Sequence, residues 1–452
     1  MRHIRISKGR ILHFMKKTLC VLDHGTLLYC LVSCIAAYLF AGCGRSTVTP
    51  GEKLTIISPH YEGIREEYGD AFNSYRQSQG RGEVELEWID QGGTSDDLRF
   101  VKSEFSRTPD GINIDIFWGG GVDPYQELKE QNLLEKHTLP EDELRSIGRD
   151  VGGVPVYDPD GLWYGSALSG FGIMFNSAVL RERQLPQPKT WTDLADGRFH
   201  NWITATDPRH SGSAHMMFEI VLQAYGWDDG FDLLGRMARN SRAFTESASQ
   251  VPKDVAQGEA AAAPVIDFYA WSESQDVEGK VGFVYPEGRT VINPDGIAIL
   301  KGAPHRSLAE EFVEFVLSEK GQKLLMLPAG KTEGPKQFTL RRMSVLPNLY
   351  DALAGKSLIE VNPFKWKSGF VYNSEKGSTR WEIVNDLVGA LMIDPHAELR
   401  QTKVVGRLVV PPVSEGEAVV LAGEKWKDAA FRNRTMSQWT SNAKKRYQSL
   451  RG

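Results

Sequence analysis

The chain has 452 residues, of which 41% are hydrophobic and 25% charged, and its mean hydropathy is −0.34. This length is enough for two or three domains, each with its own core, and the composition is that of an ordinary soluble globular protein. The formal net charge of −5 makes a nucleic-acid-binding protein a poor candidate, because such proteins present clustered positive charge.

The N-terminus differs from the rest of the chain. Six Lys and Arg residues precede or flank an apolar run of 14 residues at positions 27–40, followed by Ala41-Gly42-Cys43. The run is short for a membrane span and suits the core of a signal peptide. The series resembles the lipobox of bacterial lipoproteins, in which cleavage precedes a cysteine that carries lipid. It therefore predicts a lipoprotein signal peptide over 1–43, lipidation of Cys43 and a polar tether over 44–52. An uncleaved anchor or a plain secretory signal is the alternative.

All four cysteines lie in this leader, at positions 20, 30, 34 and 43. A mature chain would keep only Cys43, so disulfides and cysteine metal sites are excluded even in an oxidising compartment. The leader carries a charge of +5, and its removal changes the net charge from −5 to −10. We expect the mature protein to be periplasmic or extracytoplasmic and lipid-anchored to the membrane through Cys43.

Strands and helices alternate after the tether. Hydrophobic periodicity predicts strands at 54–57, 84–88 and 112–118, each followed by a helix with one apolar face, the last of them at 124–136. Such a β-α repeat indicates a parallel sheet covered by helices. Small residues follow each strand, at 58–60, 92–95 and 119–121. In such sheets ligands bind beyond the carboxyl ends of the strands, where these loops lie.

A second α/β unit follows a Gly-, Tyr- and Trp-rich segment at 154–176, which predicts a hairpin and then an extended segment. Strands are expected at 202–206, 260–266, 281–285 and 297–300, and helices at 177–183, 251–258, 309–326, 381–392 and 430–450. The loop at 207–213 precedes a helix whose apolar stripe includes Met216, Ile220 and Ala224. Ser211, Gly212 and Ser213 offer a hydroxyl and open backbone at that helix start, either as a simple N-cap or as an anion site.

Several segments in this order carry a resemblance to a known family. They are Ser58-Pro59-His60, 92–95 (GGTS), 207–214 (DPRHSGSA), 257–261 (QGEAA), 294–298 (PDGIA) and 312–322 (FVEFVLSEKGQ). The series resembles the type II periplasmic binding proteins, the solute-binding components of ABC importers, and within them the ferric-iron, phosphonate and sugar-phosphate branch. The resemblance covers about 53–330.

The resemblance implies an α/β fold with two lobes and a ligand cleft between them that closes by a hinge. Lobe 1 would comprise 53–167 and 294–345, lobe 2 would comprise 168–293, and 346–452 would form a helical C-terminal extension. The chain would cross between the lobes at Ser169-Gly170 and Asn293-Pro294.

The family positions imply a cleft rich in hydroxyl groups and backbone N–H groups, which suits an oxyanion. The implied ligand-binding residues are Ser58, His60, Thr94, Ser95, Gly120, Ser169, Ser211, Gly212, Ser213, Glu246, Asp267 and Tyr269. Of these, Glu246 and Asp267 would hold a cationic group or a sugar hydroxyl. The expected function is capture of a small anionic solute, such as an organophosphate or phosphonate, and its delivery to an ABC permease.

Two alternatives stay open at this point. Ferric-binding members commonly use two adjacent tyrosines, whereas this chain has Phe268-Tyr269, so His60, Glu62 and Tyr269 would form a weaker hard-metal site. The other alternative is a sensor that delivers its ligand signal to a membrane receptor.

No enzyme, cofactor or nucleic-acid partner is expected, and we expect a monomer. Asp207, His210 and His215 fit no standard metal spacing, and no G-x-S-x-G motif accompanies Ser211.

Overall fold

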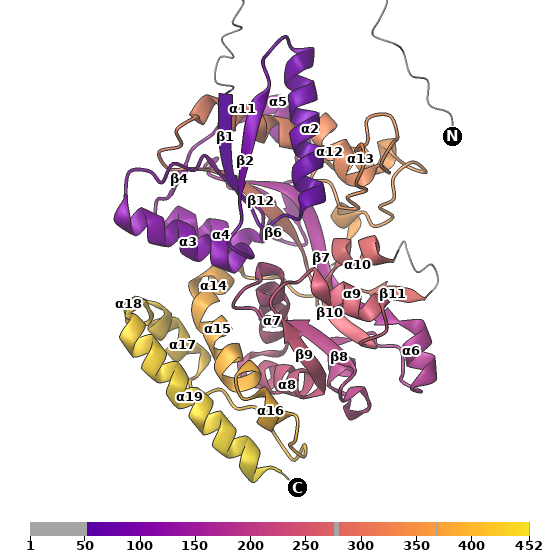
Figure 1. Ribbon diagram of the computed structural model, residues 1–452, viewed down its shortest axis with the longest axis vertical. Coiled ribbons are helices and arrows are strands. Elements are labelled where there is room, and N and C mark those ends of the chain that lie inside the picture. The colour runs from indigo at the N-terminus through magenta and orange to yellow at the C-terminus, as the bar shows by residue number, and fades with distance from the viewer. Residues whose placement is uncertain (1–51, 275–279, 368, 452) are drawn as a thin grey trace, which may run out of the picture. The chain divides into compact units, whose positions relative to one another are not determined.

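The computed structural model describes residues 52–274, 280–367 and 369–451 (Figure 1). The predicted signal peptide, the tether up to residue 51 and the lipidation site at Cys43 lie outside the described residues. No helix in the described ranges is both long enough and apolar enough to cross a bilayer. The predicted two-lobe α/β fold with a helical extension is confirmed.

Lobe 1 begins with the predicted β-α repeat. Its elements are β1 (Glu52–Ile57), α2 (Glu62–Ser78), β2 (Val84–Ile89), α3 (Thr94–Arg107), β3 (Ile116–Trp118) and α4 (Val122–Glu130). The strands β2 and β3 both pair with β1 in parallel, as the repeat predicts. The third strand is shorter than the predicted 112–118, because Asn113 has a left-handed backbone conformation with φ of 59°.

Two long strands run from one lobe into the other. They are β7 (Tyr164–Asn176) and β12 (Ile292–Leu300), which pair with each other antiparallel and place Asn293 opposite Ser169. β12 therefore begins at Ile292, before the predicted strand 297–300. In lobe 1 β12 continues the sheet beside β3, and in lobe 2 β7 continues it beside β10 (Ala262–Ile266). The predicted crossings at Ser169-Gly170 and Asn293-Pro294 lie on these two strands.

Lobe 2 is a second α/β unit, with β8 parallel to both β9 and β10 and β11 antiparallel to β7. Its further strands are β8 (Ile203–Thr206), β9 (Ser241–Thr245) and β11 (Val281–Val284). Its helices are α6 (Ser177–Glu182), α7 (Gly212–Tyr225), α8 (Trp227–Asn240), α9 (Gln250–Ala256) and α10 (Asp267–Glu273).

The remaining strands of lobe 1 are β4 (Leu134–Glu135), which pairs with β12, and β5 (Asp150–Val151) and β6 (Val154–Pro155), which pair with each other. Its remaining helices are α5 (Glu141–Ser146), α11 (Arg306–Leu317) and α12 (Glu319–Met326). The single helix predicted over 309–326 is wrong, because it is broken at Ser318. That residue is extended, and its hydroxyl accepts a hydrogen bond from Gly321 N as the N-cap of α12.

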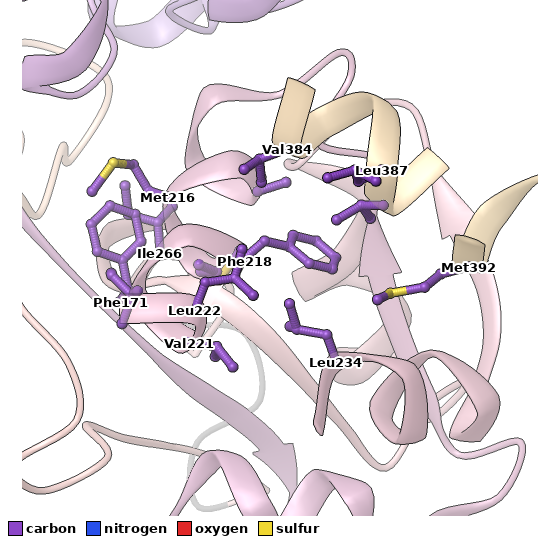
Figure 2. Close-up of a cluster of buried hydrophobic side chains, with 14 of the residues drawn as sticks. Phe171, Met216, Phe218, Val221, Leu222, Leu234, Ile266, Val384, Leu387 and Met392 are labelled. Carbon is purple, nitrogen blue, oxygen red and sulfur yellow. The ribbon is translucent and has the colours of Figure 1, made fainter. Parts of the chain in front are cut away.

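The extension packs in two places. Its first helix, α13 (Pro347–Ala352), and Ile359 belong to a core cluster of lobe 1. The part from Tyr372 onward belongs to a larger cluster that includes lobe 2 and also side chains of α3 and α4 in lobe 1. Figure 2 shows Phe218 of α7 among Val384, Leu387 and Met392 of the extension. The later helices are α14 (Ser374–Thr379), α15 (Trp381–Val388), α16 (His396–Leu399), α17 (Glu415–Ala422), α18 (Glu424–Lys427) and α19 (Ala429–Ser449).

Candidate functional site

A cavity of about 100 Å³ lies where the two lobes meet. Its wall is built from the loops that follow β1, β2 and β3 in lobe 1 and β8, β9 and β10 in lobe 2, together with the two crossing strands. The carboxyl ends of these strands therefore converge on one space, as expected for α/β sheets. The lining residues are Pro59, His60, Gly92, Gly93, Thr94, Gly120, Gly121, Ser169, Phe171, Ser211, Gly212, Ser213, Met216, Ser247, Ala248, Ile266, Phe268, Tyr269, Asn293, Asp295 and Arg342.

Eight of the twelve residues predicted to bind ligand line this cavity. They are His60, Thr94, Gly120, Ser169, Ser211, Gly212, Ser213 and Tyr269. Their contact with a solute stays a prediction. Ser211 is the N-cap of α7, because its hydroxyl accepts a hydrogen bond from Ala214 N at 3.2 Å, and it also lies 3.1 Å from Ser213 Oγ.

The other four predicted residues do not line the cavity. Ser58 is fully buried beneath His60, with its hydroxyl 3.0 Å from His60 Nδ1. The Ser95 hydroxyl donates to Pro208 O at 3.3 Å, and Glu246 is exposed to solvent. Asp267 lies behind the wall, where its carboxylate accepts hydrogen bonds from Gly170 N and the Tyr285 hydroxyl. Ser58 and Asp267 thus support the site from behind.

Arg342 is the main lining residue that the sequence did not indicate. Its side chain comes from the loop after α12, is only 2% exposed, and stacks on Phe268 with the guanidinium carbon 4.5 Å from the ring centre. Nη2 forms an ion pair with Asp295 and lies 3.3 Å from Ser169 Oγ. Nε has no hydrogen-bond partner among the described residues. A buried guanidinium with an unused donor therefore borders the cavity.

The charges around Arg342 follow from burial and from the neighbouring charged groups. Burial acts to raise the pKa of Asp295, but Arg342 and His60 outweigh it and lower the pKa to about 2, so this carboxylate is ionised. Burial lowers the pKa of His60, which is neutral at pH 7. Since Asp295 can only accept, we assign the ring proton to Nε2, 2.9 Å from Asp295 Oδ2. Nη1 of Arg342, 3.1 Å from Nε2, then faces a donor rather than an acceptor.

Two further titratable groups belong to the α10 end of the site. Burial raises the pKa of Asp267 to about 7, despite the hydrogen bonds that it accepts. Burial also raises the pKa of Tyr269 to about 12, so its phenol is protonated at neutral pH.

The lobes touch each other at the rim of the cavity. Thr94 at the start of α3 packs against Gly212 at the start of α7, and a side chain at position 212 would come within 2.8 Å of Thr94 Cβ. Gly120 has a φ of +87°, and because it has no side chain its backbone also lies close to the Thr94 side chain. Two helix starts from opposite lobes therefore meet at one cavity. The first N–H groups of a helix have no partner within the helix and carry partial positive charge.

The residues proposed for a ferric site are only partly gathered. His60 and Tyr269 line the cavity, whereas Glu62 is exposed in the first turn of α2. Across the described ranges, no three His, Cys, Asp or Glu side chains are grouped so that they could hold a metal ion. His215, which follows Asp207 and His210 in the sequence, is fully buried, and its Nδ1 lies 2.7 Å from Asn385 Oδ1.

Residues 112–330 match the model of the bacterial extracellular solute-binding protein family. The match covers slightly less than half of the chain. This range runs from just before β3 to just after α12 and includes β7, β12 and all of lobe 2. The match therefore includes both crossing strands and the part of the cavity wall that lobe 2 contributes. It does not reach Arg342.

Similar proteins agree with this assignment. The phosphoglycerate transport regulatory protein PgtC of Salmonella typhimurium is 28% identical over 219 residues, which are 48% of this chain. The chain spans about half the length of that relative, 52%.

Two solved structures share the fold. The periplasmic binding protein AfuA of Actinobacillus pleuropneumoniae, with fructose-6-phosphate bound, has a TM-score of 0.58 and 21% identity over 75% of this chain and 100% of its own. The apo ferric ion-binding protein A of Pasteurella haemolytica has a TM-score of 0.56 and 16% identity over 75% of this chain and 97% of its own. Both similarities establish the type II periplasmic binding protein fold.

Proposed function

We propose that this protein is the solute-binding component of an ABC importer and captures a small oxyanion, an organophosphate or phosphonate, by hinge closure for delivery to the permease. The observation that carries this proposal is the buried Arg342 beside the cavity, whose Nε has no hydrogen-bond partner among the described residues. A phosphate or phosphonate supplies acceptors only and suits such a donor.

The two helix starts add to the same preference. Thr94 on α3 and Gly212 and Ser213 on α7 bring hydroxyl and backbone donors from both lobes to the cavity. The mature charge of −10 opposes anions at long range, but salt screens that field over about 8 Å. Asp96 and Asp97 in the first turn of α3 offset the positive end of that helix. The α7 start is therefore the stronger of the two.

A ferric species is the second candidate, because His60 and Tyr269 line the same cavity and ferric-binding proteins share the fold. The positive charge of Arg342 opposes a bare cation there. A sensor role is the third candidate, and it draws on the name of the relative PgtC, a transport regulatory protein.

The serines at the α7 start provide the experiment. We expect Ser213→Ala to weaken binding of a phosphate ester such as 3-phosphoglycerate, or of methylphosphonate, roughly tenfold, since one charge-assisted hydrogen bond is worth about 1.5–3 kcal/mol. Isothermal titration calorimetry measures this change. Ser211→Ala should act similarly but also removes the N-cap of α7, so Ser213→Ala is the cleaner variant.

The matched control is Ser106→Ala, at the exposed far end of α3. It should leave affinity unchanged. Ferric citrate and the Tyr269→Phe variant complete the design. If both serine variants keep their phosphate-ester affinity and Tyr269→Phe loses ferric citrate binding, the solute is a ferric species and the oxyanion proposal is wrong.

We also propose that Cys43 anchors the protein to the membrane, on the basis of the leader sequence. We expect labelled palmitate to enter the wild-type protein and the control Cys34→Ser, but not Cys43→Ser, in cells of the native host. Equal labelling of Cys43→Ser would contradict the anchor.

A further inference from the structure

The later part of the C-terminal extension is fixed to lobe 2. Arg380 and Glu219 of α7 are both fully buried, and Arg380 Nη2 lies 2.6 Å from Glu219 Oε1. His215 of α7 stacks on Trp381 of α15 at 3.6 Å between ring centres. The apolar contacts of Figure 2 continue this interface through Phe218. Lobe 2 and residues 372–451 therefore share one core.

The same part of the extension also reaches lobe 1. The Tyr372 hydroxyl donates to the Asp123 carboxylate in the first turn of α4, and both side chains are buried. A methyl group at Gly377 of α14 would overlap that carboxylate and that hydroxyl. On α15, the Glu382 carboxylate lies 2.9 Å from Lys102 Nζ of α3. We call residues 372–382 the bridge.

The bridge contacts lobe 1 at α4 and at α3. Beside them lies a space of about 910 Å³ between α3 of lobe 1 and the helices α15 and α19 of the extension. Polar and charged side chains line most of it, among them Arg99, Arg209 and Arg432. Lobe 1 thus faces part of the extension across a wide polar groove, and beside this groove α4 packs against α14 at the Tyr372–Asp123–Gly377 cluster.

We propose that the bridge restrains hinge opening, holding lobe 1 close to lobe 2 even without solute. If the lobes separate about the crossing strands, α4 must leave the bridge, because the bridge remains with lobe 2. Opening then breaks the buried Tyr372–Asp123 hydrogen bond and the Lys102–Glu382 ion pair. The restraint would limit how fast solute enters and leaves, and that consequence alone rests on the proposed function.

Lobe separation can be measured without any solute. Spin labels at Ser106→Cys in lobe 1, Lys253→Cys in lobe 2 and Ser437→Cys in the extension occupy exposed positions. The four native cysteines are replaced by serine. Double electron–electron resonance then reports the lobe 1–lobe 2 distance from labels 106 and 253, and the lobe 2–extension distance from labels 253 and 437.

We expect Tyr372→Phe and Gly377→Ala each to lengthen or broaden the lobe 1–lobe 2 distance by more than about 2 Å, the scale of domain rearrangements. The first removes the hydrogen bond and the second wedges the bridge away from α4. The lobe 2–extension distance should not change in either variant.

Each variant has a matched control. Tyr447→Phe also removes a buried hydroxyl, but that group donates to Leu391 O within the extension. Gly416→Ala also adds a methyl group to a helix, at a position with nothing within 4 Å. Both should match the wild type. An unchanged lobe distance in both bridge variants would overturn the proposal, as would a lobe 2–extension distance that shifts together with it. Neither result depends on which solute the cavity binds.

Discussion

Substitution of Arg342 with glutamine is expected to lower the affinity for a phosphate ester by on the order of a hundredfold or more. The guanidinium Nε has no hydrogen-bond partner among the described residues, and with the tautomer assigned to His60 its Nη1 faces an N–H group at 3.1 Å. Two charge-assisted hydrogen bonds at about 1.5–3 kcal/mol each correspond to at least that loss. Calorimetric titration of the folded variant with 3-phosphoglycerate measures it.

The control for this variant must separate binding from folding. Arg342 also neutralises Asp295, and an unpaired buried carboxylate costs about 3–5 kcal/mol of stability. Arg342→Lys keeps the charge and should retain part of the affinity, while Arg341→Gln changes a neighbour that does not line the cavity. Unchanged affinity in a folded Arg342→Gln protein would show that Arg342 does not bind the solute.

The second large effect is expected for the anchor of the extension. Arg380→Met should lower the free energy of unfolding by about 3–5 kcal/mol, because it leaves Glu219 buried without its counter-charge. The guanidinium carbon also lies 5.0 Å from the ring centre of Trp227, and that contact is lost as well. Urea denaturation followed by tryptophan fluorescence and by circular dichroism tests the change and its two-state character.

Arg407→Met is the matched comparison for Arg380→Met. Arg407 pairs with Asp228 and Asp229 on the surface, where all three side chains are about half exposed or more. Such pairs contribute about 0–1 kcal/mol, so this variant should unfold almost as the wild type does. Equal stability of Arg380→Met and Arg407→Met would show that the buried pair does not hold the extension.

Local patterns in the sequence were sufficient for the repeat and for much of the cavity wall. Strand and helix periodicities differ, so the β-α order of lobe 1 could be predicted, and the loops after the strands had to meet at one edge. That reasoning found the loops that hold His60 and Thr94 and the α7 start, whereas the individual residues were implied by the family resemblance. Such reasoning failed where a single residue decided the backbone, as with the left-handed Asn113 and the N-cap Ser318.

Long-range contacts could not be predicted in this way. Arg342 is 282 positions from His60, stands in a loop and belongs to no motif, so nothing local marks it as part of the site. The extension was likewise predicted as helical, but amphipathic helices do not specify their partner. Only the structure distinguishes Leu349, which packs in lobe 1, from Val384, which packs against lobe 2.

The central claim, that the Arg342 cavity holds a small oxyanion, is tested most directly by the solute that the protein retains. Native mass spectrometry of protein purified from its own host, repeated after acid denaturation, gives the mass of any bound molecule. We predict one phosphorus-containing anion per chain in the wild type and none in folded Arg342→Gln. Retention of iron without such an anion, unaffected by Arg342→Gln and lost in Tyr269→Phe, would contradict the claim.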